Sequence, residues 1–112
     1  MKTVTFGVAR QEDVSRRAEA AFRGEAQGAH ISFASLELLF SLMTAKRWQI
    51  VRAMAGAGPM SIRAVARRVG RDVKAVHGDV QALLSAGIIE KADGRVVFPY
   101  EAVHVDVVVK AA

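Results

Sequence analysis

The chain has 112 residues, of which 52% are hydrophobic and none is cysteine, and its formal net charge is +5 at pH 7. This length accommodates one compact domain with a small appendage, and the hydrophobic content excludes a disordered tail. The lack of cysteine excludes disulfides, zinc–thiolate sites and cysteine nucleophiles.

The longest near-continuous apolar run, residues 38–43, is broken by Ser41 and is far shorter than the roughly 20 residues that cross a bilayer. The first residues include no apolar core of signal-peptide length and no small-residue cleavage site. We therefore expect a cytoplasmic protein with no membrane partner.

Two strands and a helix are expected before residue 35. Hydrophobic residues at every second position over 4–8 predict a half-buried strand. Apolar residues at helical spacing predict a helix over 11–23, and a short strand is expected at 30–33. These elements form an N-terminal extension that serves dimerisation or partner binding.

Two helices are expected next, because Ser35 and Thr44 are residue types that cap helix N-termini well. The first helix runs to Met43, and the second ends at Gly56 or Gly58. Glycine is common at such positions because it adopts the left-handed backbone conformation that terminates a helix.

Two further helices flank a tight turn. Ser61 caps the first, which Gly70 ends, and Asp72 caps the second, which ends near Gly87. Each has an apolar stripe that is expected to face inward. The stripes comprise Ile62, Val65, Ala66 and Val69 in the first helix, and Val73, Val76, Val80, Leu83 and Leu84 in the second.

The remaining residues predict β-structure. Asp93 and Gly94 separate two short β-prone runs, 88–92 and 95–98, which favours a hairpin with a two-residue type I′ turn. Alternating valines then predict a strand over 103–109, since β-branched side chains fit a pleated surface.

Positive charge concentrates in the middle of the chain, where residues 59–86 carry five basic and two acidic side chains. A helix, a short helix, a tight turn, a longer helix and a hairpin, in that order, are the layout of a winged helix-turn-helix. We therefore expect an α+β fold with a winged helix-turn-helix at 35–99. The strand–helix–strand extension, 1–34, precedes it, and a C-terminal strand, 100–112, follows it.

Three stretches, residues 43–54, 61–70 and 80–89, resemble the winged-helix regulators of the MarR and ArsR type. The whole chain is similar to a small prokaryotic group of MarR-like DNA-binding proteins, some of them described as antitoxins of type II toxin–antitoxin pairs. This resemblance implies a dimeric transcriptional regulator that acts at its own promoter. The chain departs from larger MarR proteins before Ser35, where those proteins have a long dimerisation helix.

The second helix of the helix-turn-helix offers candidates for reading DNA bases. Lys74, His77 and Gln81 lie opposite its apolar stripe. Lysine and histidine can donate to guanine, and glutamine can pair bidentately with adenine. The alternative is an ordinary solvated helix face, which Asp79 favours mildly because phosphates repel carboxylates, unless that carboxylate caps or pairs locally.

Basic residues around this helix are candidates for contacting the DNA backbone. Guanidinium groups suit phosphate oxygens because their donors form a planar fork. Ordinary surface solubility is the alternative for each of them. The backbone candidates are Arg63, Arg67, Arg68 and Arg71, and the candidates in the hairpin, or wing, are Arg95 and Lys91.

Catalysis has no support in the sequence. His30, His77 and His104 are too far apart for a local metal-ligand pattern. No phosphate-binding loop, nucleophile elbow or zinc-protease motif is present. We therefore expect neither an enzyme nor a bound metal or cofactor.

The two terminal strands would expose apolar edges if each were left alone. They can pair with each other or across a dimer, and we expect a symmetric dimer that places two recognition helices about 34 Å apart on palindromic double-stranded DNA. The alternative is that both strands complete the sheet of a monomer. The main alternative function is an antitoxin-type module that binds a partner toxin protein through the appendages.

Overall fold

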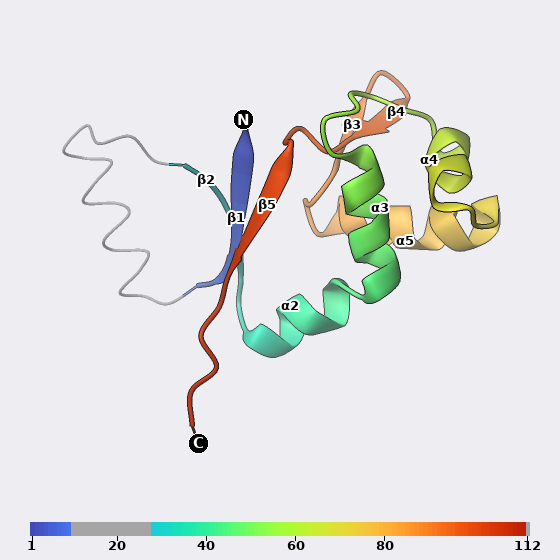
Figure 1. The fold of residues 1–112 in the computed structure, drawn as a ribbon. Helices are drawn as coiled ribbons and strands as arrows, with labels where there is room; N and C mark the ends of the chain where they lie inside the picture. The colour runs from blue at the N-terminus through green and yellow to red at the C-terminus, as the bar shows by residue number, and fades with distance from the viewer. Residues whose placement is uncertain (10–27, 112) are drawn as a thin grey trace.

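The computed structural model describes residues 1–9 and 28–111. The fold is α+β, as the sequence predicts (Figure 1). The helix expected at 11–23 lies outside the described residues. The described elements are β1 (Thr3–Val8), β2 (Ala29–Phe33), α2 (Leu36–Leu42), α3 (Ala45–Met54), α4 (Ile62–Val69), α5 (Val73–Ser85), β3 (Glu90–Ala92), β4 (Arg95–Val97) and β5 (Ala102–Asp106).

All four described helices begin where the sequence predicts. The hydroxyls of Ser35, Thr44 and Ser61 each accept a hydrogen bond from the backbone N–H three residues further on, at 3.1, 3.3 and 3.1 Å. The carboxylate of Asp72 accepts one from the N–H of Lys74 at 3.2 Å. Each such cap contributes about 1 kcal/mol, because it satisfies a backbone donor that the helix leaves free.

The helix ends agree less closely with the prediction. Gly70 does end α4 in the left-handed conformation, with φ 68°. However, α3 ends at Met54, earlier than the predicted Gly56 or Gly58, and both glycines instead adopt positive φ in the loop that follows. Met54, the last residue of α3, is also the last of its buried residues.

A three-stranded parallel sheet has the order β2-β1-β5. Phe6 stands opposite Ile31 of β2 and Val105 of β5. The two terminal strands therefore pair with each other within one chain. β5 ends at Asp106, short of the predicted residue 109, and its partner strand β1 ends at Val8.

The second sheet is the hairpin of β3 and β4. Asp93 and Gly94 have φ of 50° and 76°, and a type I′ turn requires positive φ at both positions, so this prediction is confirmed. An isolated bridge joins Met60 to Val96, which fixes the hairpin beside the segment that precedes α4.

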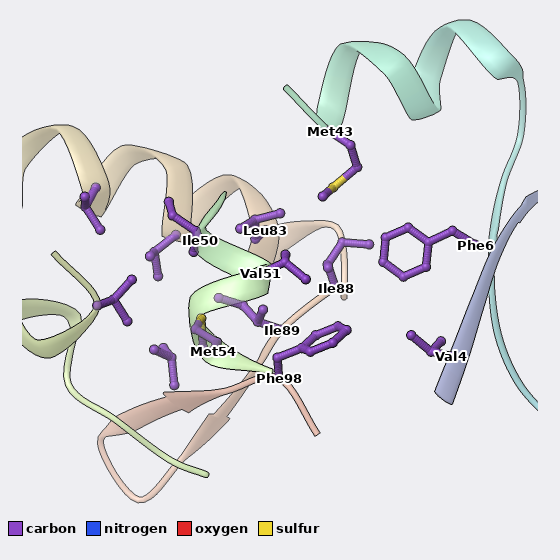
Figure 2. Packing of buried hydrophobic residues seen from close by; sticks show 14 of the residues in the cluster. Val4, Phe6, Met43, Ile50, Val51, Met54, Leu83, Ile88, Ile89 and Phe98 are labelled. Carbon is purple, nitrogen blue, oxygen red and sulfur yellow. The ribbon is translucent and has the colours of Figure 1, made fainter. Parts of the chain in front are cut away.

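One apolar core joins the sheet to the helices, as Figure 2 shows around Val4 and Phe6. The Phe6 ring lies 5.8 Å from the Phe33 ring and 5.5 Å from the Trp48 ring of α3. Val73, expected to face inward, is instead 36% exposed, because α5 begins at this residue, before the helix reaches the core. In the described part of the chain, no helix is long and apolar enough to span a membrane.

Candidate nucleic-acid interface

The solvent-facing side of α5 carries the three predicted base-reading residues. Lys74, His77 and Gln81 are all exposed, while Val76 and Val80 on the opposite side are fully buried. The predicted division of this helix into an apolar and a polar face is therefore confirmed. Its polar face can donate and accept hydrogen bonds without disturbing the core.

Gly78 lies in the middle of that exposed face. A Cβ added at this position would meet no other atom within 4 Å. Packing within the described chain therefore gives no reason for glycine here, although glycine costs a helix about 1 kcal/mol relative to alanine. The missing side chain leaves room for a close approach from outside.

Asp79 lies between two arginines from other elements. Its carboxylate accepts a hydrogen bond from Arg47 Nε of α3 at 3.0 Å and from Arg71 Nη2 at 2.9 Å. Burial alone would raise the pKa of Asp79, but the hydrogen bonds and charges of the two arginines outweigh it and hold the pKa below its ordinary value. We call these three residues the Asp79 clasp.

The Asp79 clasp ties α5 to the turn before it and to α3. All three side chains are only 17–23% exposed, so solvent screens their attraction less than it screens a surface pair. Arg47 also donates through Nη1 to the carbonyl of Leu42 at 3.0 Å, at the end of α2. The clasp therefore sets the orientation of α5 against the rest of the helices.

Arg71 requires a correction to the sequence-based prediction that it contacts the DNA backbone. Its side chain is 18% exposed, and Nη2 is engaged by Asp79. Nη1 is buried and has no hydrogen-bond partner among the described residues. Arg71 thus braces the turn from inside, because the acidic residue of α5 attracts it inward.

The other residues predicted to contact the DNA backbone lie on α4. Arg63 and Arg67 are exposed and line a hollow of about 450 Å³ together with Gly70 and Arg71, where α4 meets the start of α5. Arg68 is exposed too, but its Nη1 donates to the carbonyl of Ala53 in α3 at 3.1 Å. Arg63 and Arg67 are therefore the two arginines of α4 that the described structure leaves available to an outside anion.

The two wing candidates lie on the hairpin. Lys91 in β3 and Arg95 in β4 are both exposed, on either side of the turn at Asp93 and Gly94. The hairpin therefore carries one cation on each strand close to its exposed tip.

The histidines in the sheet are not gathered into a metal site. His30 and His104 stand on either side of Thr5 in neighbouring strands. Among residues 1–9 and 28–111, no group of three or more His, Cys, Asp or Glu could hold a metal ion.

Arg47 is the site residue that sequence reasoning assigned incompletely. Its charge, like those of Lys46 and Arg52 on the same helix, predicts only a contact with the flanking DNA backbone, because its partner Asp79 lies 32 residues away in the sequence. The one available signal was an acidic residue on an otherwise basic helix face, which indicates a local ion pair but not the identity of its partner.

The chain belongs to the HVO_A0114 family, whose model matches residues 42–105, more than half of the chain. That range begins at the end of α2 and reaches into β5, so it includes the Asp79 clasp, the exposed face of α5 and the hairpin. Neither a curated protein nor a solved structure shows significant similarity to the chain.

Proposed function

We propose that this protein is a sequence-specific, double-stranded-DNA-binding transcriptional regulator with a MarR/ArsR-like winged helix-turn-helix. In this proposal it acts as a dimeric repressor on a short palindromic operator, including that of its own promoter. The recognition helix is α5, and Lys74, His77 and Gln81 read base edges in the major groove. Arg63 and Arg67 contact backbone phosphates, and Arg95 and Lys91 of the wing contact the flanking DNA.

One observation carries the proposal: α5 presents an uncommitted polar face while the Asp79 clasp holds the helix from behind. The only acidic side chain on the middle of this helix is turned into the clasp, where two arginines neutralise it. The element order from α3 to β4 and the Met60–Val96 bridge also suit a winged helix-turn-helix. A DNA-reading helix needs both an open face and a fixed orientation.

The test begins with selection and sequencing of genomic fragments that the purified protein binds, which defines the operator. Fluorescence anisotropy then compares operator with random DNA. Lys74→Ala and Gln81→Ala should each cost about 1–3 kcal/mol on the operator and little on random DNA. Ser85→Ala, at the exposed far end of α5, is the matched control and should change neither affinity.

Arg63→Ala separates backbone contacts from base contacts. It should weaken binding to both DNAs alike and make the affinity less dependent on salt. Equal losses on both DNAs for Lys74→Ala would remove its assignment as a base-reading residue. No binding to any DNA in dilute buffer would overturn the proposed function.

A second candidate, an antitoxin-type module that neutralises a partner toxin, is favoured by the apolar surface of α2. Leu38 and Phe40 of this helix are 53% and 58% exposed, and large apolar side chains in such positions often mark protein contacts. Co-expression with the product of the neighbouring gene tests it. Phe40→Ser should abolish co-purification, whereas Gln49→Ser on α3 should not.

A further inference from the structure

β5 forms an open edge of the three-stranded sheet. Ala9 donates its backbone N–H to the carbonyl of Phe33 in β2 at 2.8 Å, so the even-numbered residues of β1 direct their backbone groups toward β5. Because Thr3 pairs with Ala102 and Thr5 with His104, those groups bond to the even-numbered residues of β5. Because backbone groups alternate in direction along a strand, Val103 and Val105 direct theirs toward the open side. In the part of the chain that the structure describes, no strand pairs with these groups.

The apolar face of the same strand is also incompletely covered. Val105 is 45% exposed. Together with Val103 it lines one wall of a groove of about 290 Å³, whose other wall is formed by Trp48 and Val51 of α3. An open edge beside an apolar groove is a surface that folded proteins normally cover.

We propose that a second copy of this chain covers this surface by pairing its own β5 antiparallel to the first, about a twofold axis at Val105. The two sheets then become one six-stranded sheet in which neither copy of β5 is an edge. An identical partner suits the site because a twofold axis uses the same patch on both subunits.

The pairing of a hydrogen-bond donor with an acceptor selects the position of the axis, because an imidazole N–H can donate to a carboxylate. With the axis at Val105, His104 stands opposite Asp106 of the partner subunit, and the twofold repeats this pair. An axis at His104 sets imidazole against imidazole, and an axis at Asp106 sets carboxylate against carboxylate. Opposed acid–base pairs stabilise neighbouring strands, whereas like charges destabilise them.

The same axis places valines together on the apolar face. Val105 stands opposite Val105 of the partner subunit, and Val103 stands opposite Val107 of the partner subunit. These side chains project toward the groove beside Trp48, since odd-numbered residues of β5 share the face of Phe6. Polar pairing on one face and apolar pairing on the other therefore follow from a single register.

The strand pairing is argued from β5 and not from DNA binding, but it supplies the dimer that the proposed function requires. A twofold dimer presents two copies of α5, as a palindromic operator requires. All measurements below are made on the full chain without DNA, so failure of the dimer and failure of DNA binding are separate results.

Cysteine cross-linking tests the register directly, because the chain has no cysteine of its own. Residues at the axis form a hydrogen-bonded pair with Cα atoms about 5.5 Å apart, within the range that a disulfide spans. Val105→Cys should therefore give a covalent dimer under mild oxidation of dilute protein. Val103→Cys is the matched control, because its two copies would lie about 13 Å apart along the strands and should stay uncross-linked.

The second measurement replaces the side chains at positions 104 and 106 and follows dimerisation by light scattering and sedimentation. His104→Glu should raise the dimer dissociation constant about 5- to 30-fold, since each Glu then faces Asp106 of the partner subunit. Adding Asp106→Lys to that variant should restore the dimer. A wild-type monomer at micromolar concentration, cross-linking of Val103→Cys in place of Val105→Cys, or no effect of His104→Glu would overturn the proposal.

Discussion

The helical part of the molecule and the three-stranded sheet are stabilised in different ways. Within the helical part, an ion pair network at Asp79 joins α3, α5 and the turn between α4 and α5. The three-stranded sheet meets the helices through apolar and aromatic contacts centred on Phe6. We therefore expect the helical part to respond to changes in charge at Asp79 and the sheet to respond to changes in packed volume at Phe6.

Phe6→Ala should have the largest effect, because Phe6 is fully buried and contacts Phe33 and Trp48. Deleting a buried phenylalanine typically lowers the free energy of unfolding by about 3–5 kcal/mol. Urea denaturation followed by Trp48 fluorescence measures it. Thr3→Ala, in the same strand but exposed, is the control and should change stability by under about 0.5 kcal/mol.

Asp79→Ala should have the second-largest effect and lower the free energy of unfolding by about 2–3 kcal/mol. The substitution leaves two largely buried arginines without their counter-charge. We also expect weaker binding to every DNA, since α5 loses its attachment to α3. Glu90→Ala, an exposed acidic residue of β3, is the matched control. A variant as stable as the wild type would show that the clasp contributes no more than a surface ion pair.

The pH dependence of stability provides a second measure of the Asp79 clasp. The pKa of Asp79 is lower in the folded than in the unfolded protein. The stabilisation by its carboxylate is therefore fully present above the unfolded pKa of about 4, and it is lost as the pH falls through the folded pKa. The stability difference between wild type and Asp79→Asn should therefore be constant from about pH 5 to 8 and shrink below about pH 4. Thermal melts across this range measure it, and a difference that grows below pH 4 would contradict the assignment.

Gly78→Ala should have the smallest effect on folding, and the effect should be favourable. A methyl group here meets no neighbour, and alanine stabilises a helix by up to about 1 kcal/mol relative to glycine. If DNA approaches closely at this point, the same variant loses operator affinity while it gains stability. Unchanged affinity would show that Gly78 has no role in the DNA contact.

Local signals in the sequence predict the helices and the hairpin well. Ser35, Thr44, Ser61 and Asp72 each act on a backbone N–H within three residues, so the helix starts can be read without knowledge of the tertiary structure. The turn at Asp93 and Gly94 is equally local. The exposed face of α5 follows from helical periodicity alone.

The features that the sequence does not reveal depend on residues far apart in the chain. Periodicity predicts β1 and β5 but not that they run parallel within one chain, because Thr3 pairs with Ala102 only in the completed fold. The inward position of Arg71 likewise depends on Asp79 and Arg47 meeting through the packing of α3 on α5. Charge identifies these residues as a group, whereas geometry decides which of them remain available.

The pairing of β1 with β5 also determines when the protein can finish folding in a cell. β1 leaves the ribosome before β5, and the two partners are about 100 residues apart, which corresponds to roughly 5–20 seconds of translation. Throughout that interval the Val4 and Phe6 side chains have no complete sheet to hold them. A chaperone that shields nascent hydrophobic segments would therefore act mainly on this N-terminal strand.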